Sequence, residues 1–90
     1  MFKIVFTNTF KKDVKLLRKR GLNMDLLKTS ITLLEQDGIL PATFQPHKLS
    51  GSFTGFWEAH LKSDWLIIWK IFPDENELWL TRTGTHADLF

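Results

Sequence analysis

Cysteine and tyrosine are both absent from this sequence of 90 residues. Without cysteine the chain can form no disulfide, no thiolate metal site and no cysteine nucleophile, so packing has to hold the fold together. No apolar run approaches the length that crosses a membrane, and residues 1–6 are too short, and too soon followed by polar residues, for a signal peptide. We therefore expect a cytoplasmic protein that has no membrane partner.

Internal repeats, low-complexity tracts and linkers are also missing. A chain of this length, 43% hydrophobic and 13% aromatic, can bury one modest core, and dividing it would leave neither half enough to bury. We expect a single domain over residues 1–90.

The net charge is only +2, but the positive charges are unevenly distributed. Half of the 12 basic residues lie between positions 11 and 20, where Asp13 is the only acidic residue. The six are Lys11, Lys12, Lys15, Arg18, Lys19 and Arg20. Such a block attracts polyphosphate and makes association sensitive to salt. A solvated helix face would have the same composition, so both interpretations stay open at this point.

The first half of the chain predicts one strand and two helices. In the first few residues apolar side chains alternate with others, which is the period of a strand with one face on the core. Asn8 or Thr9 can cap a helix that ends at Gly21. Asn23 can cap a second helix that ends at Gly38. The apolar stripes at helical spacing are Phe10, Val14 and Leu17 in the first helix and Leu27, Ile31 and Leu34 in the second.

The second half predicts a sheet. Residues 40–54 contain two prolines and no sustained periodicity, so we expect a long loop there. Three strand-like segments follow, at residues 55–62, 65–72 and 77–82. Because the turns between them are short, neighbouring strands should be antiparallel. Thr85 can cap a last helical turn that ends at Phe90, which completes an α+β fold.

Strand periodicity predicts which of these side chains leave the core. In residues 57–62 the even-numbered side chains, His60 among them, should face away from the helices. In the third segment Leu78, Leu80 and Arg82 should share one face, with Arg82 at the end of an otherwise apolar row.

All three histidines lie in the second half, each in a different segment, at His47, His60 and His86. Composition alone would explain them equally well as incidental residues, but Asp64 follows His60 across a turn and Arg82 closely precedes His86. Imidazoles move protons in either direction, and a guanidinium holds a phosphate through two hydrogen bonds. RNA supplies its own nucleophile, the 2′-hydroxyl, so these groups suffice for strand cleavage without a metal.

Two other chemistries fit less well. Three histidines and Asp64 could coordinate zinc, but no compact ligand motif such as His-Glu-x-x-His is present. The serines lie in loop contexts without the Gly-x-Ser-x-Gly elbow of serine hydrolases.

Two aromatic residues lie beside the candidate site. Trp65 begins a strand next to Asp64, where its indole could stack on an RNA base or pack beneath the loop. Phe90 could dock into the core or form a wall of the site beside His86. The remaining strand tryptophans should belong to the core, and they are Trp57, Trp69 and Trp79.

Four segments together resemble a known family. They are residues 10–15, 47–51, 60–65 and 82–90, with the sequences FKKDVK, HKLSG, HLKSDW and RTGTHADLF. In order and spacing they are similar to YafQ-type toxins of the RelE superfamily, over nearly the full length of the chain.

The resemblance implies a RelE-like fold, in which an N-terminal strand and a two-helix hairpin pack on a twisted antiparallel sheet that a short helical turn follows. It implies an endoribonuclease that cleaves translated messenger RNA in the A site of the 30S ribosomal subunit, without a metal or other cofactor. A cognate antitoxin should bind and silence the enzyme, and operator DNA should be contacted only through the antitoxin.

The resemblance also assigns roles by position. His86 and His60 are the expected proton-transfer pair, and Asp64 is the residue that orients one of them or acts as an alternative base. Arg82 is the expected phosphate clamp and His47 an auxiliary group. The residues expected to contact RNA are Trp65, Phe90, Lys11, Lys12, Lys15, Arg18 and Lys19.

The chain departs from this family at Trp57, where relatives commonly have an arginine, and the change removes a charge near the RNA path. The lack of tyrosine excludes the tyrosine-dependent mechanism of some more distant RelE-like enzymes. Two other functions stay open, namely a toxin of the same fold that acts on DNA gyrase and a non-enzymatic module that binds nucleic acid or antitoxin through its basic helix.

Overall fold

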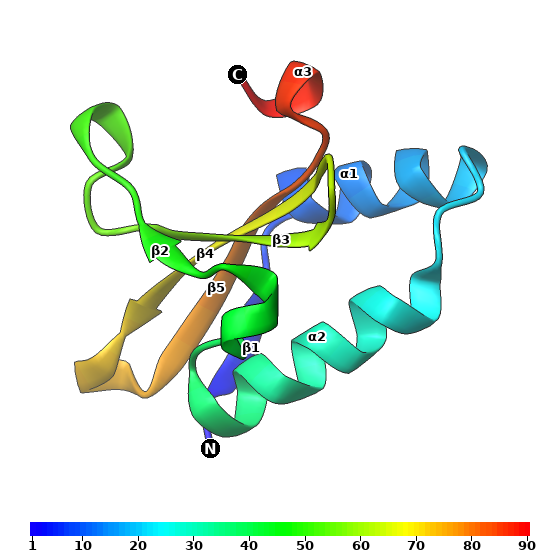
Figure 1. Cartoon of the computed structure of the whole chain (residues 1–90). Coiled ribbons are helices and arrows are strands. Elements are labelled where there is room, and N and C mark those ends of the chain that lie inside the picture. Colours follow the sequence, from blue (N-terminus) through cyan, green and yellow to red (C-terminus); the bar gives the residue numbers. More distant parts are fainter.

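The computed structural model describes all 90 residues as a five-stranded sheet with two long helices packed on one face (Figure 1). The strands are β1 (Lys3–Phe6), β2 (His47–Lys48), β3 (Trp57–Lys62), β4 (Trp65–Phe72) and β5 (Glu77–Gly84). The helices are α1 (Asn8–Lys19), α2 (Met24–Asp37) and α3 (His86–Leu89), and 3₁₀ turns lie at Ala42–Phe44, Gly51–Phe53 and Pro73–Glu75. This confirms the predicted α+β class. None of the helices combines the length and the apolar character needed to span a membrane.

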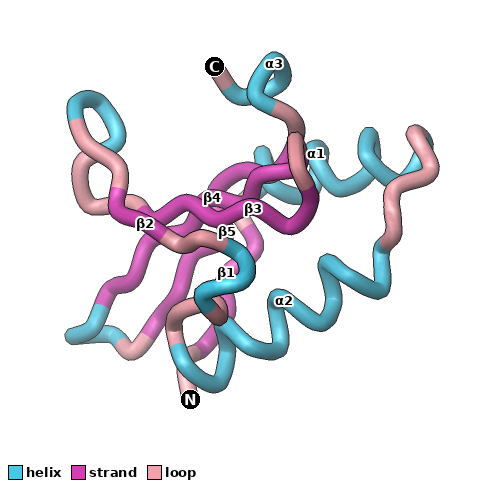
Figure 2. Tube along the Cα trace, in the orientation of Figure 1, coloured by secondary structure: helices cyan, strands magenta, loops and turns pink.

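The strand order is β1-β5-β4-β3-β2, so the first and last strands of the chain are neighbours (Figure 2). β1 runs parallel to β5, with Lys3 opposite Glu77 and Phe6 opposite Leu80, whereas all other neighbours are antiparallel. The sheet is therefore mixed and not wholly antiparallel as the sequence predicted. Short turns identify the antiparallel pairs, but nothing near β1 in the sequence indicates a partner at the other end of the chain.

The helix ends are fixed by their capping residues. α1 is capped by Thr7 and not by Asn8 or Thr9 as predicted, and the Thr7 hydroxyl accepts the N–H of Phe10 and donates to the carbonyl of Leu80. Asn23 caps α2 as predicted, through bonds from two backbone N–H groups. Gly38 ends α2 in the left-handed region, with φ 73°, which favours glycine.

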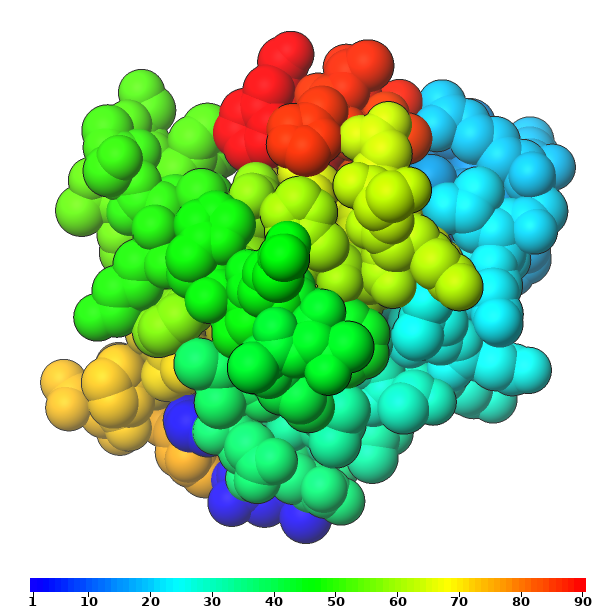
Figure 3. Space-filling model, viewed as in Figure 1, coloured from blue at the N-terminus to red at the C-terminus, as the bar shows by residue number.

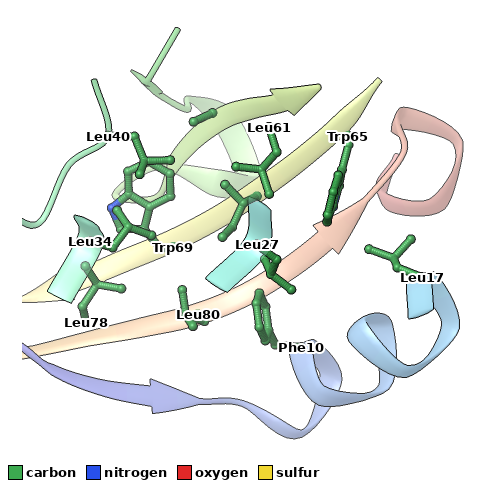
Figure 4. Close-up of a cluster of buried hydrophobic side chains, with 12 residues drawn as sticks. Phe10, Leu17, Leu27, Leu34, Leu40, Leu61, Trp65, Trp69, Leu78 and Leu80 are labelled. Carbon is green, nitrogen blue, oxygen red and sulfur yellow. The ribbon is translucent and has the colours of Figure 1, made fainter. Parts of the chain in front are cut away.

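The core fills the space between α1, α2 and one face of the sheet (Figure 4). Leu34 of α2 and Trp69 of β4 are fully buried at its centre, and the Trp69 indole donates to the carbonyl of Gly38. Trp57 is half-buried and stacks on Trp69, with 6.2 Å between ring centroids. Trp79 was expected in the core but is 38% exposed, because Leu78 and Leu80 of β5 face the core and Trp79 between them faces the opposite side.

That opposite face of the sheet, away from α1 and α2, is called the open face below. Ala59 and Leu61 of β3 are in the core. Because side chains alternate along a strand, Glu58 and His60 lie on the open face, as predicted. Across the strands, the register aligns His47, Glu58, Ile68 and Arg82 in one row of this face.

Arg82 reaches the open face through an irregularity in β5. Leu80 is opposite Trp69 and Arg82 is opposite Ile68, so Thr81 has no partner on β4. Such a β-bulge breaks the two-residue period of the strand. The predicted row of Leu78, Leu80 and Arg82 on one face is therefore wrong, and Arg82 lies on the face opposite to the two leucines.

The segment 40–54, predicted as a long loop, contains the short strand β2 between two 3₁₀ turns. β2 pairs with β3, with His47 opposite Glu58 and Lys48 opposite Trp57. A strand of two residues is too short to leave a period in the sequence. Its effect is to bring His47 to the open face beside His60.

Candidate active site

The three histidines form a row at the open face. The ring centroids of His47 and His60 are 6.3 Å apart, and those of His60 and His86 are 6.1 Å apart. The rings come from β2, β3 and the start of α3. Figure 3 shows the C-terminal segment, in red, lying against the yellow residues of the β3–β4 turn at the surface. The fold therefore brings together three residues that the sequence places in separate segments.

His86 at one end of the row is held by Asp64. Its Nδ1 lies 3.0 Å from Asp64 Oδ1, and its backbone N–H donates to the same oxygen over 3.2 Å. Since a carboxylate accepts only, Nδ1 is the donor, and in the neutral form of the ring Nε2 has the lone pair. The hydrogen bond from the imidazole, followed by that from the backbone, lowers the pKa of Asp64. Both side chains are more than half exposed, so a large substrate can reach them.

His47 at the other end of the row has both ring nitrogens occupied. Nε2 lies 3.2 Å from Glu58 Oε1, and Nδ1 lies 3.1 Å from the carbonyl of Gln45. Both partners are acceptors, and only the imidazolium form can donate to both. The Glu58 side chain is only 7% exposed. Glu58 was not among the predicted site residues, although its place on the same strand face as His60 could have indicated it.

His60 in the middle of the row makes no hydrogen bond within the protein, so both of its ring nitrogens are free for a substrate. It lines an open hollow of about 380 Å³ between β3 and the first 3₁₀ turn. The other lining residues are Thr43, Phe44, Gln45, Leu61, Lys62 and Ser63.

Arg82 is paired with Asp13 of α1. Its Nε and Nη2 donate to the two oxygens of Asp13 over 2.8 and 3.2 Å, and Thr83 N–H donates to Asp13 Oδ2 over 3.1 Å. β1 ends opposite Leu80, so Asp13 supplies the acceptor that the exposed edge of β5 lacks beyond that point. The hydrogen bonds from this pair raise the pKa of Arg82. Nη1 and the second hydrogen of Nη2 remain available to a phosphate.

A second ion pair joins α1 to α3. Arg20, just after the last residue of α1, donates to both oxygens of Asp88 over 2.7 and 3.1 Å. This pairing is the main cause that lowers the pKa of Asp88 and raises that of Arg20. Arg20 therefore differs from the rest of the basic block, because its charge already has a partner.

The two aromatic candidates differ in exposure. Trp65 is 3% exposed, and its indole donates to Thr83 Oγ1 over 2.9 Å, so of the two predicted alternatives the structure has the packing one. Phe90 is 60% exposed, with its ring 6.3 Å from His86 and edge-on to Phe53 at 5.5 Å. Phe90 therefore forms a wall beside the row of histidines.

The basic residues Lys11, Lys12, Lys15, Arg18 and Lys19 are all exposed along α1. Lys12, Lys15 and Lys19 surround a shallow hollow of about 260 Å³ on the solvent side of the helix. A larger hollow of about 410 Å³ lies between α1 and α2, away from the histidines, and is lined mainly by apolar side chains such as Phe6, Val14 and Ile31. The lysine stripe suits phosphate, whereas the hollow between the helices is mainly apolar and has Arg18, Asp25 and Lys28 among its lining residues.

No three His, Asp or Glu side chains converge closely enough to hold a metal ion. The fold and the site instead define a class of small α+β proteins in which carboxylate-paired histidines and an arginine line the open face of a mixed sheet. Over residues 2–90 the sequence matches the family described as the bacterial toxin of type II toxin-antitoxin systems, YafQ. The chain belongs to this family.

Individual relatives agree with this assignment. The chain is 42% identical over 88 residues to the mRNA interferase toxin YafQ of Escherichia coli K12, which covers 97% of this chain and 94% of the relative. It is also similar to the toxin in a crystal structure of the E. coli DinJ-YafQ complex, with a TM-score of 0.89, 41% identity and coverage of 100% and 99% of the two chains. A metal-bound toxin from Helicobacter pylori matches with a TM-score of 0.91 and 37% identity over the whole of both chains.

Proposed function

We propose that this protein is the toxin of a type II toxin-antitoxin pair and cleaves messenger RNA in the A site of the ribosome. Its membership of the YafQ family supports the toxin assignment, and the E. coli relative that is 42% identical is named an mRNA interferase. The observation that carries the chemistry is the row of three imidazoles, in which each ring has a different hydrogen-bonding state.

In this proposal the 2′-hydroxyl of the message attacks the adjacent phosphorus. His86 Nε2, the free nitrogen of the ring that Asp64 orients, accepts the hydroxyl proton. The bond from phosphorus to the 5′-oxygen breaks, and His60 donates a proton to that oxygen. The products are a 2′,3′-cyclic phosphate and a free 5′-hydroxyl, so no water or cofactor enters this step.

The cationic groups support the crowded phosphorus. Arg82 offers the donors that Asp13 leaves free, and the imidazolium form of His47, which can donate to both Glu58 and the Gln45 carbonyl, would add a positive charge at the other side of His60. Donors that are held in place before the reaction need no reorganisation as charge develops. This division of labour makes His47 an electrostatic group and not a proton carrier.

The partners follow from the surfaces. The stripe of Lys12, Lys15 and Lys19 suits the phosphates of ribosomal RNA, and Lys11 and Arg18 extend it along α1. Phe90 is the exposed aromatic surface beside the site on which a base can stack. A cognate antitoxin silences the enzyme, as the crystallised complex of the related DinJ-YafQ pair suggests, and operator DNA is contacted through that antitoxin.

The test is primer extension on a message translated by purified ribosomes. New ends should appear in the A-site codon with the wild type, and His86→Ala or His60→Ala should slow cleavage by about 100-fold or more. Asp74→Ala, an exposed residue of the turn before β5, serves as the matched control and should cleave at the wild-type rate. A message with a single 2′-deoxynucleotide at the cleaved position should stay intact if the 2′-hydroxyl is the nucleophile.

Three outcomes would contradict the proposal. Equal cleavage of naked RNA would remove the ribosome requirement. Unchanged cleavage by the His86 variant would favour a binding module in which the histidines are incidental. Absence of cleavage together with inhibition of DNA supercoiling by gyrase would favour the other target known for this fold.

A further variant tests whether Arg82 acts mainly through its proposed contact with the phosphate or through its ion pair with Asp13. Arg82→Ala should lose most of the cleavage, by about 10- to 100-fold, because a charge-assisted phosphate contact is removed. The fold should survive, since Asp13 still accepts the N–H of Thr83. Circular dichroism and urea unfolding check this; an unfolded variant would instead assign Arg82 a purely structural role.

A further inference from the structure

We propose that Arg20 is a positioning residue for the reaction and acts on His86 through Asp88. The proposal rests on the acid–base role assigned to His86 above. Arg20 belongs to the basic block of residues 11–20 but was not among the residues expected to contact RNA, so no specific role was predicted for it.

The segment that carries His86 is too short to hold its own position. α3 spans four residues, His86–Leu89, and a single helical turn is not stable in isolation. Its internal bonds are those of one turn, with the N–H groups of Asp88 and Leu89 donating to the Thr85 carbonyl. Contacts with the rest of the protein therefore decide where the His86 ring lies relative to His60.

Asp88 connects this turn to the rest of the protein. Its carboxylate accepts the N–H of Thr85 over 2.9 Å, while the Thr85 hydroxyl accepts the N–H of Asp88, which completes a capping box. The same carboxylate receives the two hydrogen bonds from Arg20. Gly84 permits the close approach, because a Cβ at this position would lie 3.0 Å from Asp88.

α1 provides the fixed end of this connection. Asp13 and Arg20 are two helical turns apart, so they lie on the same side of the helix. Asp13 holds Arg82 and Thr83 at the end of β5, and Arg20 holds Asp88 beyond it. The stretch from Arg82 to Asp88, which contains His86, is therefore attached to α1 at both of its ends.

The geometry distinguishes this role from RNA contact. Both Nη atoms of Arg20 donate to Asp88 in a bidentate contact, which fixes the orientation of the carboxylate as well as its distance. The charge of Arg20 is compensated locally, unlike the charges of Lys12, Lys15 and Lys19, whose side chains have no carboxylate partner. Loss of Arg20 should thus lower the rate at which the message is cleaved on a bound ribosome more than it weakens binding to the ribosome.

The test compares Arg20→Ala with Lys19→Ala in steady-state cleavage of programmed ribosomes, which gives kcat and KM separately. Arg20→Ala should lower kcat about tenfold with little change in KM, because a small misplacement of a reacting group is sufficient for such a loss. Lys19→Ala should instead raise KM and leave kcat close to that of the wild type. If Arg20→Ala raises KM alone, Arg20 is an ordinary RNA contact and the proposal is wrong.

Two more variants test the route through Asp88. Arg20→Lys keeps the charge but cannot form the bidentate contact, so its kcat should lie between those of Arg20→Ala and the wild type. Asp88→Ala should reduce kcat, and the double variant Arg20→Ala with Asp88→Ala should show no further loss beyond that of Asp88→Ala alone, because Arg20 acts through Asp88. Full recovery with lysine, or additive losses, would contradict the proposal.

A structural readout keeps this test independent of activity. In hydrogen-exchange NMR the amides of Asp88, Leu89 and Phe90 should exchange several-fold faster in Arg20→Ala than in the wild type and in Lys19→Ala. Unchanged exchange would overturn the positioning role. If the wild type fails to cleave any message, the proposed function falls, while faster exchange in Arg20→Ala would still establish the connection between α1 and α3.

Discussion

Asp13 should be a determinant of stability, although it lies in a block of basic residues on a surface helix. Its carboxylate accepts the N–H of Thr83, at the exposed edge of β5 beyond the end of β1, and two hydrogen bonds from Arg82. The Asp13 side chain is 13% exposed and that of Arg82 31%. Replacing Asp13 with alanine leaves the backbone N–H without a protein partner and removes the counter-ion of Arg82.

The magnitude follows from these contacts. A hydrogen bond to a charged group contributes roughly 1.5–3 kcal/mol, and an ion pair with this degree of exposure adds at most about 1 kcal/mol. Water that reaches the vacated edge offsets part of the loss, so Asp13→Ala should lower the free energy of unfolding by about 2 kcal/mol. For a domain of this length that corresponds to a fall in Tm of about 10 °C.

The assay is urea unfolding followed by tryptophan fluorescence, with Asp74→Ala as a control that should differ from the wild type by less than about 0.5 kcal/mol. Asp13→Asn keeps an acceptor oxygen for Thr83 N–H and should lose only about half as much stability as alanine. Equal unfolding midpoints for the wild type and Asp13→Ala would refute the view that Asp13 replaces a strand partner.

Three other measurements test the fold. Leu34→Ala, at a fully buried position, should cost about 3 kcal/mol in urea unfolding. Gly38→Ala should lower Tm in calorimetry, with a loss of about 1–3 kcal/mol, because φ is 73° and a Cβ would lie 2.6 Å from the Phe2 ring. Because Arg20 holds the pKa of Asp88 well below its ordinary value, this carboxylate stabilises the fold above about pH 4 and the contribution is lost as the pH falls further. As the pH is lowered below about 4, the Tm of Asp88→Asn should therefore decrease less than that of the wild type. An equal decrease of Tm in the two proteins would contradict the assignment.

Much of the fold was predictable because it depends on local patterns. Asn23 begins α2 and Gly38 ends it, as the capping chemistry predicts. The alternation in β3 correctly predicted that His60 lies on the face away from the helices. The second antiparallel hairpin, from Trp65–Phe72 to β5, followed from its short turn. These features need only neighbouring residues, so one sequence is sufficient to find them.

The features that escaped prediction depend on partners distant in the chain. The bulge at Thr81 shifts Arg82 to the open face, and no residue type in β5 marks it. The partner of Arg82 is Asp13, and that of Asp88 is Arg20, each separated by most of the chain. The three histidines could be proposed as a set, but their order in the row depends on β2, which was too short to detect.

The parallel pairing of β1 with β5 has a consequence for the order of folding. Residues at opposite ends of the chain must meet, as Lys3 does with Glu77, and such long loop closures slow folding. β5 is the last strand to be synthesised, so β1 has no partner until residues 77–84 have left the ribosome. His86 follows β5 in the chain, so the three histidines can align only after every strand of the sheet has been synthesised.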